Sequence, residues 1–128
     1  MTISVEFEGG CVTYDNKKTG AAPVLKLLEN KGHDIVLITE DTKESLEEAR
    51  KWFKDNGIRI LCDNLNTKYI DMFISPKDVN AHLTKGYSDN EPFLDWRTVI
   101  VALKEKGLIT AEEFQKLETE IWREMYEF

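Results

Sequence analysis

Two glutamates near the start of the chain, Glu6 and Glu8, have the residue type and the spacing of paired catalytic carboxylates. They close an apolar stretch that begins at Ile3, and Gly9 and Gly10 follow directly and allow a sharp turn of the backbone. Side chains two residues apart in a strand point to the same side, so both carboxylates are expected at one strand end. In a parallel α/β sheet that end binds ligands, and the pair therefore predicts a site there.

The elements that must position this pair alternate between strands and helices along the chain. Apolar and β-branched runs predict strands at residues 2–8, 35–38, 58–62 and 70–74. Helical spacing of apolar residues predicts helices at residues 23–31, 46–57, 93–107 and 110–128. Such alternation is typical of a parallel sheet joined by right-handed crossovers. We therefore predict an α/β domain over residues 1–128, with a core at 1–107 and a C-terminal helical extension at 108–128.

Capping residues mark where three of these helices begin. Pro23 suits the first turn of its helix, and Asp41 with Glu44 resembles a capping pair for the helix over 46–57. Thr110 and Glu113 have the form of a capping box for the last helix. The apolar stripe of the last helix is Phe114, Leu117, Ile121, Met125 and Phe128, widened by Trp122 and Tyr126. We expect this stripe to dock on its own domain, because the preceding turn is short.

The order of these motifs resembles that of the haloacid dehalogenase (HAD) superfamily, in particular its small capless phosphatase-like subgroup. The family's first motif, Asp-Phe-Asp-Gly-Thr after an apolar strand, corresponds to Glu6-Phe7-Glu8-Gly9. Residues 32–39 are similar to the second strand, which ends at the motif II threonine, here Thr39. Residues 70–78 stand where the family has an apolar strand and paired aspartates. The resemblance covers residues 2–104 and implies a three-layer αβα, doubly wound, mostly parallel sheet.

The resemblance also implies roles for individual residues. Glu6 takes the place of the nucleophile and Glu8 that of the general acid/base, while Thr39 and Lys68 would hold the transferred phosphoryl group. The family binds magnesium at this site, and the candidate metal ligands here are Glu6, Glu8 and Asp78. The full ligand-binding set that we predict is Glu6, Glu8, Gly9, Thr39, Glu40, Asp41, Lys68 and Ser75.

Departures from the family motifs favour binding over catalysis. Each glutamate moves its carboxylate by one methylene, and misplacing a reacting group by about 1 Å can cost roughly a hundredfold in rate. Ser75 and Pro76 replace the paired aspartates that supply hard oxygen ligands for Mg²⁺. Asp41 reverses the charge of an arginine found near the phosphate in close relatives. We therefore predict a catalytically degenerate HAD-like protein that binds a small ligand or a protein partner, with a magnesium-dependent phosphatase as the alternative.

Simpler interpretations of the same residues remain open. The two glutamates can be solvated strand-end residues, Thr39 can cap the following turn, and Lys68 can be an ordinary surface lysine. The last helix can also be the working surface of an interaction module, with dimerisation through its apolar stripe. A monomer is favoured.

Composition limits the partners. A net charge of −7 disfavours a grip on the phosphate backbone of nucleic acid, and no apolar run reaches the length of a membrane span. Cys11 and Cys62 lack metal-like spacing, which favours free thiols and a cytoplasmic location.

Overall fold

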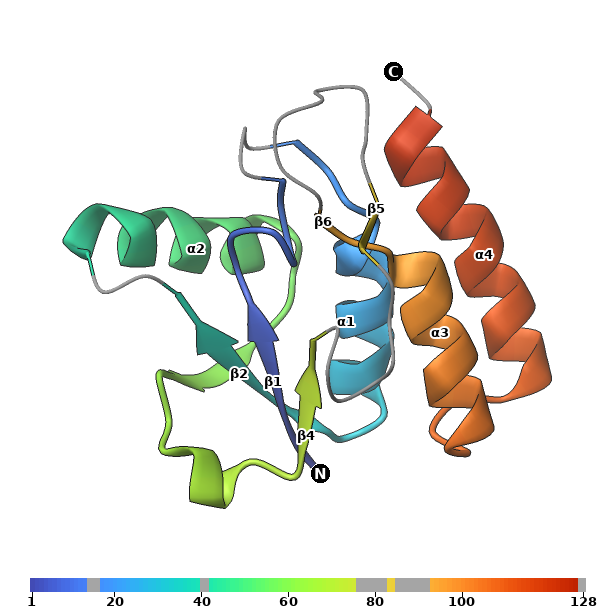
Figure 1. The fold of residues 1–128 in the computed structure, drawn as a ribbon, viewed down its shortest axis with the longest axis horizontal. Coiled ribbons are helices and arrows are strands. Elements are labelled where there is room, and N and C mark those ends of the chain that lie inside the picture. The colour runs from blue at the N-terminus through green and yellow to red at the C-terminus, as the bar shows by residue number, and fades with distance from the viewer. Residues whose placement is uncertain (14–16, 40–41, 76–82, 85–92, 127–128) are drawn as a thin grey trace.

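A parallel sheet of four strands forms the centre of the protein, for which a computed structural model describes residues 1–13, 17–39, 42–75, 83–84 and 93–126 (Figure 1). The strand order is β3-β2-β1-β4. The strands are β1 (Thr2–Glu6), β2 (Asp34–Ile38), β3 (Ile60–Asp63) and β4 (Met72–Ile74). A separate antiparallel pair consists of β5 (Leu83–Thr84) and β6 (Phe93–Leu94). The predicted α/β class and the parallel sheet with β1 inside it are confirmed.

The register of the sheet places the ends of its strands side by side. Ile3 of β1 pairs with Ile35 of β2 and with Met72 of β4, and all these pairings are parallel. The carboxyl ends of the strands therefore meet at one edge, the end toward which the arrows point in Figure 1. β1 itself ends at Glu6, two residues before its predicted end, so Glu8 belongs to the turn that follows.

The described residues form four α-helices: α1 (Ala21–Asn30), α2 (Lys43–Asp55), α3 (Trp96–Glu105) and α4 (Ala111–Tyr126). Pro23 lies in the first turn of α1, as predicted. The predicted cap of α2 is wrong: its N-cap is Thr42, whose side chain accepts a hydrogen bond from the Ser45 amide at 3.1 Å. The short 3₁₀ helix η1 (Thr67–Tyr69) precedes β4. No described helix has both the length and the apolar character needed to cross a bilayer.

The capping box of α4 is confirmed by two reciprocal hydrogen bonds. The Thr110 amide donates to Glu113 Oε1 at 2.8 Å, and the Glu113 amide donates to Thr110 Oγ1 at 3.1 Å. Lys31 Nζ, at the end of α1, also contacts Glu113 Oε1 at 2.6 Å. Glu113 thus caps the N-terminus of α4 and also links that helix to the end of α1 through Lys31.

The core is a single apolar cluster to which all four described helices contribute. It joins alternate residues of the strands to the helices, as in Ile3, Val5, Ile35, Leu37, Leu25, Phe53, Val99 and Ile121. The intervening strand residues Ser4 and Val36 are buried too, but they lie outside this cluster. The general α/β layout therefore agrees with the structure, whereas the finer HAD-type doubly wound arrangement with helices on both faces stays a prediction.

Helix α4 docks on its own chain, as expected from its apolar stripe. It packs against α3 and α1, with Leu117 only 3% exposed and Ile121 fully buried (Figure 1). A Cβ atom at Gly20 would lie 2.7 Å from Ile121 Cγ2, so the glycine permits this close approach. Trp122 is 57% exposed, so the prediction that it widens the buried stripe is wrong. Phe128 lies outside the described residues.

Candidate functional site

The turn after β1 is built around the carbonyl of Phe7. That oxygen accepts hydrogen bonds from the amides of Gly10, Cys11 and Val12, at 3.0–3.3 Å. Gly9 has a φ of 79°, and a Cβ atom at Gly10 would lie 2.2 Å from the Glu6 carbonyl oxygen. Both glycines are therefore required by the backbone, and the predicted sharp turn is confirmed.

Hydrogen bonds from residues later in the sequence also hold this turn in place. The Gly10 carbonyl accepts from Thr19 Oγ1 and from Trp96 Nε1, each at 2.8 Å, and the Leu94 amide donates to the Gly9 carbonyl at 2.8 Å. Thr19 and Trp96 are both buried. A buried indole N–H needs an acceptor, and the Gly10 carbonyl supplies it for Trp96. The turn is thus held in place before any ligand arrives.

Glu8 and Thr39 meet at the carboxyl edge of the sheet. Thr39 Oγ1 lies 2.6 Å from Glu8 Oε1 and 3.2 Å from Glu8 Oε2, so the hydroxyl donates a hydrogen bond to the carboxylate. The Thr39 amide donates to Asn64 Oδ1 at 3.3 Å, and the Asn64 amide donates to the Leu37 carbonyl at 2.8 Å. The segments that follow β1, β2 and β3 therefore converge, and sequence analysis did not identify Asn64, whose φ of 50° suits an asparagine.

Glu6 and Ser75 lie on neighbouring strands at the same edge. Glu6 is exposed and pairs with Ile38, the residue before Thr39. Ser75 follows Ile74, which is the register partner of Val5. Glu6, Glu8, Gly9, Thr39 and Ser75 are thus brought to one edge of the sheet, as expected.

Lys68 is not brought to this edge. It lies in η1, which precedes β4 and so stands at the amino edge of the sheet, where the Thr2 amide donates to Asp71 Oδ2 at 2.7 Å. Its ammonium nitrogen sits 4.9 Å from the centre of the Tyr69 ring. The predicted phosphoryl-holding role of Lys68 is therefore incompatible with a site at Glu8. Three further candidates, Glu40, Asp41 and Asp78, lie outside the described residues, as does Pro76.

The described residues do not form a preassembled cage of metal ligands. Among these residues, no group of three or more His, Cys, Asp or Glu side chains is placed to hold a metal ion. Mg²⁺ demands near-octahedral oxygen coordination and is usually held through one or two carboxylates with substrate and water. The Glu8 carboxylate instead accepts the Thr39 hydroxyl. No step of a reaction is therefore assigned to a metal here.

The thiol of Cys11 lies near Glu8 and is expected to be unreactive. Burial, and to a smaller extent the negative charge of Glu8, raises the pKa of the Cys11 thiol well above its usual value. The thiol therefore stays protonated and is a poor nucleophile, because the thiolate is the reactive form. Cys11 and Cys62 are both free, as predicted.

Comparisons with family models, with curated proteins and with solved structures found no match to this chain. The resemblance to the HAD superfamily therefore stays a prediction from the sequence motifs.

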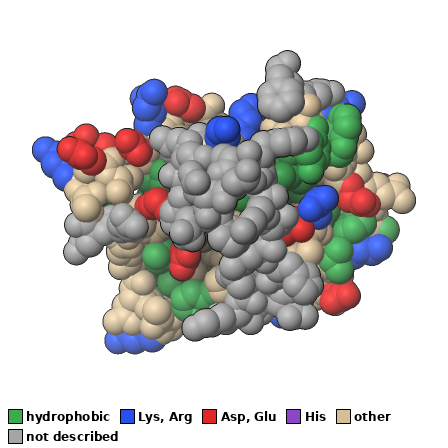
Figure 2. Space-filling view, turned by 45° about the horizontal axis from the view of Figure 1, so that its top comes forward, with side chains coloured by type: hydrophobic (Ala, Val, Ile, Leu, Met, Phe, Trp, Pro, Cys, Tyr) green, Lys and Arg blue, Asp and Glu red, His purple; other side chains and the backbone are tan. Residues whose placement is uncertain are grey.

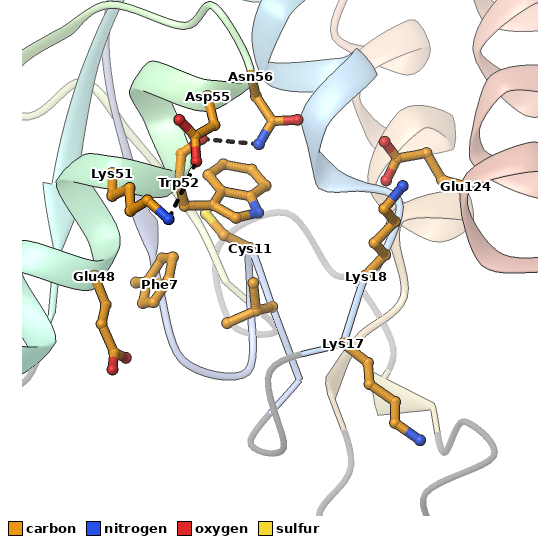
Figure 3. A pocket seen from close by; sticks show the side chains of 11 residues that line it. Phe7, Cys11, Lys17, Lys18, Glu48, Lys51, Trp52, Asp55, Asn56 and Glu124 are labelled. Carbon is orange, nitrogen blue, oxygen red and sulfur yellow. Dashed lines mark hydrogen bonds and ion pairs between the residues drawn. The ribbon is translucent and has the colours of Figure 1, made fainter. Parts of the chain in front are cut away.

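A second feature, a cavity of about 440 Å³, lies next to the turn after β1, and its described lining includes neither Glu8 nor Thr39 (Figure 3). Its walls come from the turn after β1, from Lys17 and Lys18, from the second half of α2, and from Glu124 near the end of α4. Sequence analysis assigned Trp52 to a helix but did not connect it with the other walls. Over the visible described surface in Figure 2, basic and acidic side chains are interspersed rather than gathered in one patch.

Proposed function

We propose that this chain is a catalytically degenerate HAD-like protein that acts by binding a small ligand or a protein partner and does not hydrolyse phosphate esters. The hydrogen bond from Thr39 Oγ1 to Glu8 Oε1, at 2.6 Å, carries the proposal. In the HAD family, the hydroxyl at the position of Thr39 holds the phosphoryl group, and the carboxylate at the position of Glu8 transfers a proton. Here the two groups engage each other, so neither is directed at a substrate.

Electrostatics at the edge also supports a role without phosphoryl transfer. Glu6 and Glu8 keep the two negative charges that the family's aspartates carry at this edge, so a bound phosphate dianion would need cations nearby to offset them. Lys68, the cation expected to offset them, stands at the other end of the strands. A phosphate would therefore meet negative charge without the lysine that the family uses.

Steady-state phosphate release tests the proposal. We expect the wild-type protein to release no more phosphate than Glu6→Gln from p-nitrophenyl phosphate and from nucleoside monophosphates, with or without Mg²⁺. Glu47→Gln, on the exposed face of α2, removes the same charge elsewhere and serves as the matched control. Magnesium-dependent turnover that survives in Glu47→Gln and is lost in Glu6→Gln would instead establish the alternative, a phosphatase with glutamates at the aspartate positions.

A further inference from the structure

The cavity beside the turn has the size of a small-molecule site. Its volume of about 440 Å³ falls within the range of roughly 300–1,000 Å³ that such sites occupy. The segments that form it lie far apart in sequence, because Val12, Trp52 and Glu124 all contribute to its walls (Figure 3). It is therefore a product of the tertiary fold and not of one loop.

The apolar side of the cavity is aromatic and held in a fixed orientation. The Trp52 ring meets Phe7 at 6.2 Å between ring centres and Phe53 at 5.0 Å, at interplanar angles of 70° and 81°. Asn56 Nδ2 also donates to the Trp52 carbonyl at 2.8 Å. Trp52 remains partly exposed, and its indole lines the cavity. The part of the indole that lines the cavity can contact a flat aromatic ligand.

The charged side of the cavity holds one lysine, Lys17, that is available to an acidic group on that ligand. In Figure 3 Lys17 extends away from Trp52 and the Lys18 ammonium points toward Glu124, and Lys17 forms no ion pair with any residue that the structure describes. Three acidic side chains also line the cavity, namely Glu48, Glu124 and Asp55, and Asp55 is paired with Lys51 at 3.9 Å. Burial raises the pKa of Glu124, whereas the nearby Lys18 lowers it. A lysine ammonium on its flexible stem can turn toward an anion.

Helix α4 makes the cavity dependent on the C-terminal extension. Glu124 lines the cavity one turn beyond Ile121, whose side chain is fully buried and packs at Gly20, the N-cap of α1. Lys18 lies two residues before Gly20, so the docked helix places Glu124 against the wall that Lys18 belongs to. The C-terminal extension therefore contributes Glu124 to the cavity and buried residues such as Ile121 to the hydrophobic core.

We propose that this cavity binds a flat aromatic molecule that carries an acidic group, with the ring against Trp52 and the acidic group toward Lys17. The proposal goes beyond the binding role proposed above, because it names a ligand class and a set of lining residues that does not include Glu6, Glu8 or Thr39. The two proposals fail separately. Phosphatase turnover would overturn the first and leave the cavity site intact.

Titration with 1-anilinonaphthalene-8-sulfonate, an aromatic sulfonate whose fluorescence rises in apolar sites, tests this proposal on the full chain. We expect saturable binding of one probe per chain, and an affinity at least about tenfold lower in the double variant Lys17→Glu/Lys18→Glu. Both lysines are exposed, so this variant is expected to fold. Trp52→Ala should lose binding as well. Lys43→Glu and Trp122→Ala, which change the same residue types outside the cavity, should bind as the wild type does.

Three results would overturn the proposal. The first is no saturable binding by the wild type in fluorescence and calorimetric titrations. The second is unchanged affinity in the Lys17→Glu/Lys18→Glu variant. The third is tighter binding of a cationic aromatic probe, N-methylquinolinium, than of the sulfonate. A cooperative thermal transition in each variant separates binding to this cavity from binding to a loosened core.

Discussion

Removing the Thr39 hydroxyl should destabilise the protein through its contact with Glu8. Thr39→Val keeps the volume and the β-branch of the side chain but removes the donor that lies 2.6 Å from Glu8 Oε1. A hydrogen bond to a charged group contributes about 1.5–3 kcal/mol to the free energy of unfolding. Both side chains are only partly buried, so water can replace part of this contribution and the lower end applies.

The expected loss is therefore about 1–2 kcal/mol, or roughly 4–8 °C in melting temperature for a domain of this size. Because Glu8 has further interactions, a single substitution at Glu8 would overstate the value of the pair. A double-mutant cycle isolates it: urea unfolding of wild type, Thr39→Val, Glu8→Ala and the double variant gives the coupling energy. We expect a coupling of at least about 1 kcal/mol, within the range of about 0.5–3 kcal/mol found for contacting pairs.

Thr119→Val is the matched control for that cycle. Thr119 is exposed on α4, and its hydroxyl makes only a 3.4 Å contact with the Gln115 carbonyl, so its replacement should leave the free energy of unfolding nearly unchanged. A coupling energy for Thr39 and Glu8 below about 0.3 kcal/mol is within the usual error of additivity. Such a value would refute the view that these two groups satisfy each other.

Three further predictions concern the fold. Ile121→Ala should lower the free energy of unfolding by about 2–5 kcal/mol, because Ile121 is fully buried. The loss should be the same at every protein concentration, and the mass measured by light scattering should not change. A dimer that becomes a folded monomer would contradict docking of α4 within the chain. Gly10→Ala should lower the melting temperature sharply, because its Cβ would lie 2.2 Å from the Glu6 carbonyl oxygen, and an unchanged melting temperature would contradict the turn. The Lys31 and Thr110 contacts lower the pKa of Glu113 from its ordinary value of 4.5, so their stabilisation is present above that pH and is lost as the pH falls through the lowered pKa. The difference in melting temperature between wild type and Glu113→Gln should therefore shrink below pH 4.5, and a difference that grows there would contradict the pairing.

Local patterns in the sequence were enough to predict most of the elements. The apolar run at 35–38 lies in β2, where Ile35, Val36 and Leu37 are buried, and Thr110 with Glu113 caps a helix through contacts three residues apart. Trp122 was misjudged because it directly follows Ile121, and adjacent residues on a helix point in directions about 100° apart. Its side chain therefore leaves the buried stripe and is exposed.

The candidate site could be predicted only in part, because some of its contacts join segments that are distant in the sequence. Glu8 and Thr39 each follow a parallel strand, which places both at the carboxyl edge. Lys68 precedes a strand, and the same rule puts it at the opposite edge, although its position in the family pattern suggested otherwise. The contacts of Trp96 and Asn64 join residues 86 and 25 positions apart, and no local pattern reveals them.

Fluoroberyllate with Mg²⁺, followed by ¹⁹F NMR on the full chain, tests most directly whether this edge can support phosphoryl transfer. The reagent mimics a phosphoryl group on a carboxylate and so reports whether Glu6 can occupy the position of the nucleophile. We expect only the signals of free fluoroberyllate species, identical for wild type and Glu6→Gln. A magnesium-dependent protein-bound signal that disappears in Glu6→Gln and persists in Glu47→Gln would contradict the proposed loss of catalysis.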